Sequence, residues 1–417
     1  MQFSLPIVLA SSIYGSTPSV SAPWFLNRKT LLQLAHCDSG IIQDSIDDWR
    51  HEGSRMSHIY ANASMTLSAT WAANPHQGCF VTLDERFTSR TRTFTDSDDK
   101  TYELHCHEVL GDMKTPLFER GWVFQERMLS TRIVHFMEQE LWWECRECFH
   151  CECDGFDHRF DRRDRQGALE LSELSPLESI EENWEHLIET YSSKSLTYPG
   201  DIFPAVQALA KLIPSKMGKY LAGHWEGTFI SSLGWLPSKP IRNKRNNWRA
   251  PSWSWAAAQG PVAWRMRYIR PIIACATLLS ALTIPKGDDP MGQISYGFAI
   301  LRGKFLTLER QELEHGHDHG LVLEGERFGK FDGCTVGWDN VCRGKVAKRV
   351  FVFLLFAADV VYDKRQFWLI LEAVEGKEGD YARIGTLLVN VLEGSGLRTR
   401  LSRALNDKAV EMDVKII

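Results

Sequence analysis

The sequence predicts an α/β fold at the amino-terminal end of the chain, followed by a helical segment and a carboxy-terminal region that is mostly β. Three observations support this. An amphipathic helical pattern precedes a short strand near residue 65, a run rich in Asp, Glu and Arg occupies residues 154–183, and short β-prone stretches follow residue 250. With 417 residues, 44% of them hydrophobic, the chain is long enough to bury the cores of roughly two or three domains. Disorder throughout is thereby excluded.

The first predicted helix covers residues 44–60, where apolar side chains recur at helical spacing. Ser45 and Asp48 form an opening that resembles a capping box. Residues 65–70 then have the pattern of a short strand. A helix followed by a strand indicates α/β layering.

A second helix is predicted from Pro116, a residue that suits the first helical position, to about Leu129. Two strands follow, over residues 132–136 and 140–145, joined by a short polar turn. Before this helix, residues 91–99 are polar and we expect them to be exposed, while residues 102–106 have strand character.

The charged run divides the chain into four predicted parts. These are an α/β domain over residues 1–153, a linker or exposed insertion over 154–183, a helical segment over 184–249 and a β-rich region over 250–417. Helical patterns cover residues 184–191 and 202–212, and the clearest strands of the last region lie at 297–301, 350–356, 367–371 and 384–389.

Charge and hydropathy exclude two classes of partner. The net charge of -5 leaves no basic surplus for a phosphate backbone, so we expect no nucleic-acid binding. The longest apolar runs fall short of the roughly 20 residues that a membrane helix needs, so we expect a soluble chain with no membrane span. Ten cysteines, four of them between Cys145 and Cys153 and the rest scattered, favour a reducing compartment, the cytoplasm. The alternative is secretion, for which the apolar residues 3–10 resemble a signal peptide without a basic start.

Three segments carry recognisable motifs. They read IIQDSIDDWRHEGSRMSHIYANASMTLSAT from Ile41, PLFERGWVFQERMLSTRIVHFMEQELWWEC from Pro116, and RAPSWSWAAAQG from Arg249. The first resembles the central part of fungal heterokaryon-incompatibility (HET) domains. The second is similar to the closing helix and hairpin of that family, and the third resembles segments that follow the domain in many members. The resemblance covers almost everything after about Asp38.

The sequence departs from the family pattern at its start. Members begin with a strand-rich third that holds a Cys-Trp-Gly motif, which does not occur before Ile41 here, and CDSGIIQ stands where a second family motif is expected. We therefore expect a partial HET domain lacking its amino-terminal third, from either a truncated gene model or a degenerate domain.

The resemblance implies a role in fungal non-self recognition, as an effector or signalling module of programmed cell death that works through protein partners or self-association. It also implies a TIR or flavodoxin-like fold through remote kinship to TIR domains, some of which cleave NAD. Three interpretations therefore stay open: an assembly module, a TIR-like enzyme with NAD as substrate, and a degenerate non-functional paralogue. No cofactor is expected.

Glu126, in the motif RGWVFQER, is the candidate catalytic residue. Cleavage of a glycosidic bond needs a carboxylate that stabilises an oxocarbenium-like centre, together with groups that orient the nucleotide. Arg120 is the second catalytic candidate, since it can hold phosphate or pair with the acid, and Trp122 is a candidate for stacking on the nucleotide. The alternative is structural, with Glu126 in a salt bridge or cap and Trp122 in the core.

Other clusters predict no metal site. Cys145, Cys148, Cys151 and Cys153 crowd one segment with His150, whereas zinc sites separate two ligand pairs by a longer loop. The His residues of EHGHDHG are typical of a flexible turn, and the two Trp residues of PSWSW favour the core over a ligand groove.

Overall fold

The computed structural model describes residues 7–9, 56, 58–74, 76–82, 90–106, 115–152, 174–238, 248–265, 271–312, 319–323, 326–328, 334–339, 349–360, 363–390 and 396–417. The chain forms two compact units, Met1–Gln166 and Gly167–Ile417, which are described separately below. The division lies within the charged run at residues 154–183. Most of the first predicted helix, at residues 44–60, lies outside the described residues, but residues 58–62 are helical.

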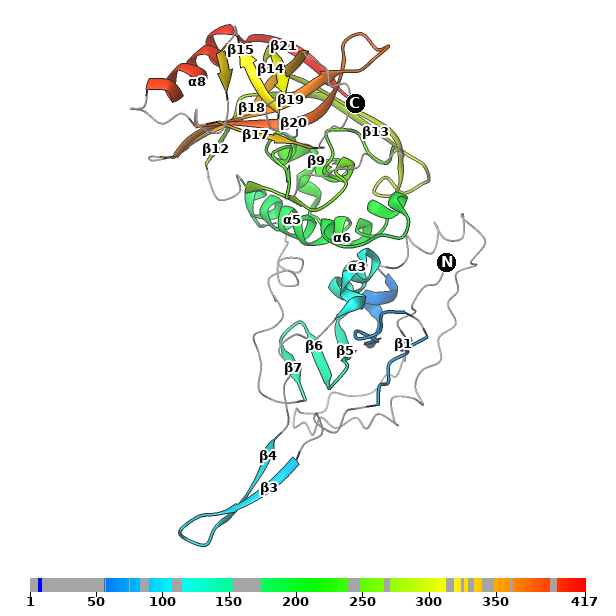
Figure 1. Ribbon diagram of the computed structural model, residues 1–417. Helices are drawn as coiled ribbons and strands as arrows, with labels where there is room; N and C mark the ends of the chain where they lie inside the picture. Colours follow the sequence, from blue (N-terminus) through cyan, green and yellow to red (C-terminus); the bar gives the residue numbers. More distant parts are fainter. Residues whose placement is uncertain are drawn as a thin grey trace. The chain divides into compact units, whose positions relative to one another are not determined.

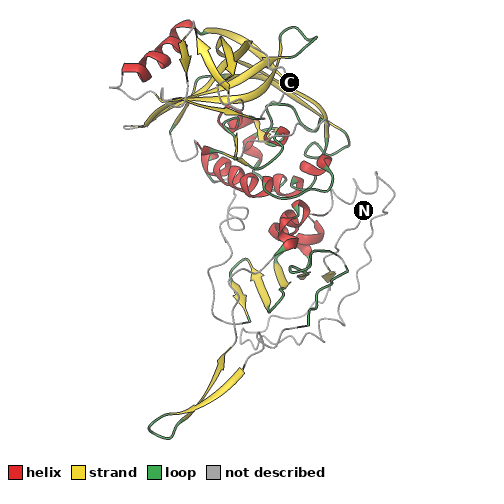
Figure 2. Ribbon diagram, viewed as in Figure 1, coloured by secondary structure: helices red, strands yellow, loops and turns green. Residues whose placement is uncertain are grey.

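A small mixed sheet organises the first unit (Figures 1 and 2). Its strand order is β1-β2-β5-β6-β7, with bounds Ile7–Leu9, Met65–Ser68, Arg132–Phe136, Leu141–Cys145 and Phe149–Cys151. β2 and β5 run parallel, and the other described neighbours in this sheet are antiparallel. The predicted α/β content and the hairpin formed by β5 and β6 are confirmed, whereas kinship to TIR or flavodoxin-like folds stays a prediction.

The helix predicted from Pro116 to Leu129 is interrupted. A 3₁₀ turn, η2 (Pro116–Glu119), precedes the α-helix α3 (Gly121–Leu129). Arg120, between them, has an extended backbone with φ -90° and ψ 133°. Its N–H closes the 3₁₀ turn on Leu117 O, and its own carbonyl accepts the first α-helical bond from Phe124. The continuous helix was therefore a wrong prediction, and the break redirects the chain at the start of α3.

A separate hairpin consists of β3 (Arg90–Thr95) and β4 (Thr101–Cys106). Residues 91–99 are exposed as predicted, but most of them belong to a strand. Phe94 and Tyr102 face each other across the hairpin with about half of each side chain exposed. The strand at 102–106 is confirmed as β4.

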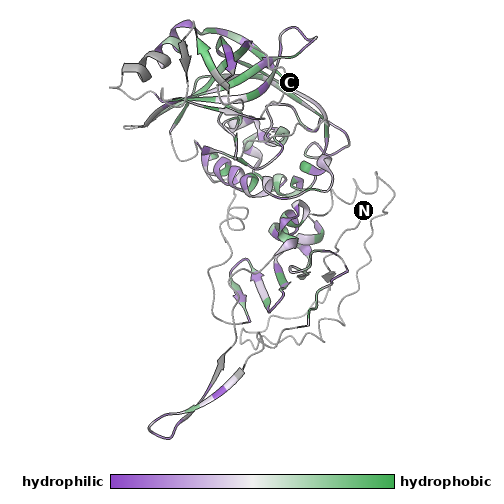
Figure 3. Cartoon of the chain, viewed as in Figure 1, coloured by the Kyte–Doolittle hydropathy of each residue, from purple (hydrophilic) through white to green (hydrophobic). Residues whose placement is uncertain are grey.

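The second unit opens with α5 (Leu177–Ser192), which begins seven residues before the predicted Trp184. Ile180 and Glu181 are buried together with Trp184, so the acidic residues here belong to a packed helix and not to a solvated linker. Figure 3 shows hydrophilic and hydrophobic positions interspersed along α5, as an amphipathic helix requires.

The helix predicted over residues 202–212 is reduced to α6 (Gln207–Ala210) after the 3₁₀ turn η3 (Pro199–Ile202). Pro204 has no N–H to continue a helical ladder, which explains the shortening. The remaining short elements of this segment are η4 (Ser215–Met217), β8 (Tyr220–Leu221), β9 (His224–Trp225), η5 (Glu226–Thr228), α7 (Phe229–Ser232), β10 (Leu236–Pro237), η6 (Trp255–Ala257) and β11 (Val262–Ala263).

Trp253 and Trp255 of the PSWSW motif are both buried in this segment, as the core interpretation predicts. They lie in a turn and in η6 instead of a strand. The indoles of Trp184 and Trp255 both donate to Gly223 O, at 2.9 and 3.0 Å. The turn between β8 and β9 is therefore a point where α5 and η6 meet.

A large sheet completes the second unit, and its pairings close into a ring. Around the ring each strand pairs with the next, in the order β14 (Ile294–Glu312), β18 (Arg349–Val360), β19 (Asp363–Ala373), β20 (Asp380–Asn390) and β21 (Val410–Ile416), with β21 returning to β14. The outer strands are β12 (Ile272–Ala274), β13 (Thr277–Pro285), β15 (His319–Leu323), β16 (Glu326–Phe328) and β17 (Cys334–Trp338). The predicted β-rich region is confirmed.

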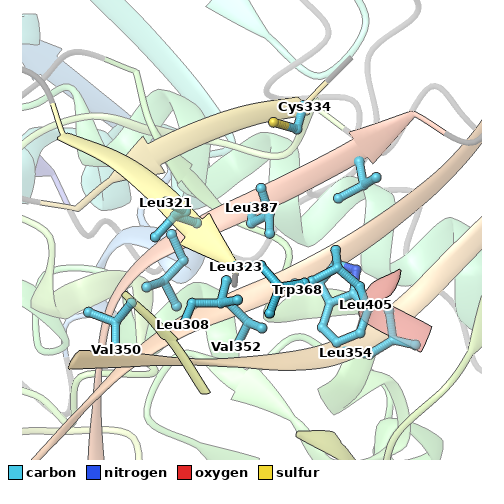
Figure 4. Packing of buried hydrophobic residues seen from close by; sticks show 12 residues of the cluster. Leu308, Leu321, Leu323, Cys334, Val350, Val352, Leu354, Trp368, Leu387 and Leu405 are labelled. Carbon is cyan, nitrogen blue, oxygen red and sulfur yellow. The ribbon is translucent and has the colours of Figure 1, made fainter. Parts of the chain in front are cut away.

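Two central strands of the ring, β18 and β19, are longer than predicted, and residues on both of their faces are buried. Val350, Val352 and Leu354 of β18 enter a hydrophobic cluster with Trp368 of β19 (Figure 4). Phe353 and Leu355, which alternate with these residues along β18, are also buried, and α7 packs against this strand. Leu405 of α8 (Gly396–Lys408) belongs to the same cluster.

One buried arginine links the sheet to the helical segment of the second unit. Arg383 of β20 donates to Asp339 Oδ2 at 2.9 Å and to the backbone carbonyls of Leu233 and Trp235. Its guanidinium carbon also lies 3.4 Å from the centre of the Trp235 ring. Among the residues that the structure describes, no helix has both the length and the hydropathy to cross a bilayer.

Candidate functional site

A small cavity in the first unit lies between the sheet and α3. It has a volume of about 40 Å³, which accommodates a few water molecules. Its walls come from β2, the η2–α3 segment and β5, and are formed by Thr66, Leu67, Ser68, Ala69, Leu117, Phe118, Val123, Glu126, Arg127, Ile133 and His135. Two walls of the cavity are the strands β2 and β5, which run parallel in the sheet. The third wall is the η2–α3 segment.

The break at Arg120 determines which side chains reach the cavity. Because α3 restarts at Gly121, the cavity-lining residues Val123, Glu126 and Arg127 stand at positions i, i+3 and i+4, which share one helix face. Phe118 of η2 is buried beside them, and the Arg127 guanidinium carbon lies 4.7 Å from the centre of its ring. The carboxyl group of Glu126 and the guanidinium of Arg127 therefore lie on the same face of α3, next to the buried Phe118.

A chain of hydrogen bonds runs from the cavity wall into the sheet. Ser68 Oγ lies 2.9 Å from Thr70 Oγ1, and Thr70 Oγ1 lies 2.9 Å from His135 Nδ1. His135 Nε2 lies 2.8 Å from Glu144 Oε2. Arg127 completes the chain by donating to both Glu144 oxygens, at 2.9 and 3.1 Å. We call this the Ser68–Arg127 relay.

The relay orients its own protons. An ionised carboxylate only accepts hydrogen bonds, so His135 Nε2 carries a hydrogen that it donates to Glu144. In a neutral imidazole Nδ1 is then an acceptor, toward which the Thr70 hydroxyl donates. Ser68, Thr70 and His135 are all buried. Ser68 and His135 also line the cavity. The relay therefore connects the cavity wall to the buried carboxylate of Glu144 through a continuous series of hydrogen bonds.

A second hydrogen-bonded branch anchors the end of α3 to β2. Ser130 Oγ donates to Glu126 O at 2.8 Å and lies 2.8 Å from Thr66 Oγ1. The single Ser130 hydroxyl hydrogen is used in the first bond, so Thr66 donates in the second. This branch fixes the backbone of Glu126 relative to the strand that forms the opposite wall.

The two carboxyl groups near the cavity have opposite pKa shifts. Burial raises the pKa of Glu126 to about 7, and it outweighs a hydrogen bond with Tyr60 and the charge of Arg120, which lower it. Burial would also raise the pKa of Glu144, but the hydrogen bond from His135 and the charge of Arg127 hold it well below its ordinary value. Glu126 can thus exchange a proton near neutral pH while Glu144 stays ionised.

The structure brings together some of the residues that the sequence predicts as a site. Glu126 lines the cavity, and Arg120 acts on it through its charge from the position before α3. Trp122 is half-buried on α3 and lies outside the cavity wall. The proposed stacking role of Trp122 stays a prediction without a cavity contact to support it.

Sequence reasoning missed the relay, although the predicted hairpin contained a signal for it. His135 interrupts the apolar strand RIVHF, and Glu144 interrupts LWWEC. In the observed register His135 faces Trp142, and Ile133 faces Glu144, so His135 and Glu144 lie diagonally on the same face. Two lone polar residues on one face of an apolar hairpin indicate a buried pair.

The other candidate clusters gather no metal ligands. Among the described side chains no three His, Cys, Asp or Glu residues are arranged to hold an ion. Cys145 and Cys148 lie together, with Sγ atoms 3.3 Å apart, while Cys151 packs against the cluster of Met137, Trp142 and Phe149. Cys153, His315 and His317 lie outside the described residues.

The first unit is thus a mixed α/β domain with a small, mainly apolar cavity that Glu126 of α3 lines. Residues 37–126 match the family described as Heterokaryon incompatibility protein (HET). This match confirms the resemblance to a HET domain over residues 37–126. The match includes β2 and η2 and ends at Glu126, within α3. Neither a curated protein nor a solved structure matches the sequence.

Proposed function

We propose that this chain acts in the cytoplasm in fungal non-self recognition, as an effector or signalling module of programmed cell death. The observation that carries this proposal is the HET match over residues 37–126. In this role the first unit transmits the signal, through protein partners or through self-association. Ten cysteines spread over the chain support a reducing compartment.

A second candidate function is cleavage of NAD, and the position of Glu126 favours it. A glycosidase-type reaction needs one carboxyl group whose pKa lies near the working pH and groups that stabilise developing charge. Glu126 has a pKa of about 7 and lines a cavity that Arg127 also lines. The cavity volume of about 40 Å³ is far smaller than a dinucleotide, so this activity requires the wall to open.

The substitution Glu126→Gln separates the two functions, since it keeps the side-chain shape and removes the titratable group. The wild-type chain and the variant are expressed from an inducible promoter in a fungal host, with growth as the readout. The same purified proteins are tested for NAD loss and for self-association by light scattering. Glu119→Gln is the matched control, because Glu119 is exposed on η2 close to the same helix.

The effector module predicts that Glu126→Gln retains toxicity and self-association with no NAD loss in either protein. The enzyme predicts that wild type and Glu119→Gln consume NAD, and that Glu126→Gln loses both consumption and toxicity while its circular dichroism spectrum is unchanged. A wild-type chain that is well folded but neither toxic nor active on NAD contradicts both and supports a degenerate paralogue.

A further inference from the structure

The hairpin formed by β6 and β7 ends in two cysteines that face each other. The register pairs Trp143 with His150 and Glu144 with Phe149, and the next facing pair is Cys145 with Cys148. Cys145 N–H donates to Cys148 O at 2.9 Å, so the two residues close the turn around Arg146 and Glu147. Cα atoms of such a hydrogen-bonded pair lie about 5.5 Å apart, within the range over which disulfides form.

The two sulfur atoms are close and reachable. Cys145 Sγ and Cys148 Sγ are 3.3 Å apart, and both residues are only partly buried. The turn residues Arg146 and Glu147 are exposed, so a small thiol reagent can approach the pair from solvent. Bond formation therefore requires a small approach of two side chains and no rearrangement of the strands.

The two thiols are chemically unequal. Burial would raise the pKa of the Cys145 thiol, but the backbone N–H groups of Cys148 and Glu147 stabilise its thiolate and bring the pKa below its ordinary value. Cys148 N lies 3.3 Å from Cys145 Sγ. Burial and the adjacent Cys145 sulfur raise the pKa of Cys148. Cys145 is thus the better nucleophile, and Cys148 is placed to resolve a mixed disulfide.

The third described thiol of the hairpin lies apart from the pair. Cys151 faces Trp142 in the register, and side chains alternate along a strand, so Cys151 and Cys148 lie on opposite faces of β7. Cys151 packs with the cluster that contains Trp142 and Phe149. It therefore provides a matched control within the same hairpin.

We propose that Cys145 and Cys148 form a reversible redox site that is oxidised by a low-molecular-weight disulfide such as oxidised glutathione. The Cys145 thiolate attacks one sulfur of the oxidant, which breaks the oxidant's S–S bond and releases one glutathione thiolate. Cys148 then loses its proton, its sulfur attacks Cys145 Sγ, and the second glutathione thiolate leaves. Two thiols of the chain are oxidised by two electrons in total, and the oxidant is reduced to two thiols.

The test equilibrates the full-length chain in glutathione buffers of increasing oxidised fraction, traps the remaining thiols with iodoacetamide and digests with trypsin. Trypsin cleaves after Arg146, so the proposed bond joins the peptide 133–146 to the peptide 147–159. Wild type and Cys151→Ser are expected to lose two alkylatable thiols and to give this linked pair. Cys145→Ser and Cys148→Ser are expected to lose it, and reduction by dithiothreitol restores both thiols.

Three results would overturn the proposal. They are full alkylation of Cys145 and Cys148 in the most oxidising buffer, a linked peptide of undiminished yield in Cys148→Ser, and a link found only in covalent dimers on a non-reducing gel. The order of attack has its own readout at pH 7. Cys145 in the Cys148→Ser variant should be alkylated several-fold faster than Cys148 in the Cys145→Ser variant, and the reverse order overturns the assignment of the nucleophile.

Discussion

At the scale of single residues, Glu126 and Glu144 show how a fold assigns two states to one type of side chain. Both lie beside the cavity, but only Glu144 is held by a bidentate arginine and a histidine. Burial raises the pKa of Glu126 to about 7, and the hydrogen bond with Tyr60 and the charge of Arg120 offset only part of this rise. Pairs of carboxyls whose pKa values diverge are a recurrent feature of sites that exchange protons.

The shifted pKa of Glu126 predicts a pH-dependent stability. Its pKa is about 7 in the folded chain and roughly 4.3 in an unfolded one. Between these values the folded state keeps a proton that the unfolded state releases, so the free energy of unfolding falls as the pH rises through this window. The contribution is fully present below about pH 4.3 and is lost above about pH 7, and amounts to on the order of 3–4 kcal/mol.

Urea unfolding of wild type and Glu126→Gln between pH 4.5 and pH 8 measures this effect, because other titrating groups cancel in the difference. The wild type should lose stability relative to the variant as the pH rises, and Glu119→Gln should follow the wild type. Parallel profiles for wild type and Glu126→Gln would mean that the carboxyl has an ordinary pKa.

At the scale of elements, the turn between β8 and β9 controls the packing of the helical segment. Ala222 and Gly223 both have positive φ, 45° and 92°, as a type I′ hairpin turn requires. Gly223 O accepts both the Trp184 and the Trp255 indoles. A Cβ at position 223 would lie 2.2 Å from Trp255 Nε1, so only glycine fits.

Gly223→Ala is therefore expected to lower the free energy of unfolding by roughly 3 kcal/mol or more, from backbone strain and steric overlap together. Gly376→Ala is the control, since Gly376 has φ 75° and open space around its Cβ position. It should cost only the strain, about 1–2 kcal/mol. Chemical denaturation measures both variants, and equal losses would show that the indole contact at Gly223 relaxes freely.

Much of the element pattern could be predicted, and the exceptions have physical causes. The strands β18, β19 and β20 follow from long apolar runs, and the hairpin of β5 and β6 from strand propensity. The break at Arg120 could not be predicted, because a single residue with extended backbone does not disturb the helical spacing of apolar residues in the sequence. Glu126 was predicted as a site residue, but its partners were not, because Ser68, Thr70 and His135 meet through a parallel pairing of distant strands.

At the scale of the whole molecule, Arg383 connects the large sheet of the second unit to its helical segment. Its side chain is fully buried, that of Asp339 is 7% exposed, and the arginine also satisfies two carbonyls of the helical segment. Removing one member of a buried ion pair leaves the other charge without compensation, which costs far more than the pair contributes. Arg302 and Asp413 form the same bidentate contact on the surface, with side chains 52% and 47% exposed.

Arg383→Met is expected to reduce the free energy of unfolding by about 3–5 kcal/mol, and Arg302→Met by less than about 1 kcal/mol. The double variant Arg383→Met with Asp339→Asn should be more stable than the sum of the two single losses implies, since the uncompensated carboxylate is gone. Calorimetric or urea unfolding compares these variants, together with the single variant Asp339→Asn, with the wild type. Similar losses at Arg383 and Arg302 would argue against a buried ion pair that organises this unit.

The ring of the second unit is completed by β21, which pairs with β14 so that Ala299 faces Ile416. A nascent chain leaving the ribosome therefore keeps the edge of β14 that pairs with β21 open while the following hundred or so codons are being translated. During that interval the sheet lacks the strand that joins β20 to β14. The ring can therefore close only after β21 has been synthesised.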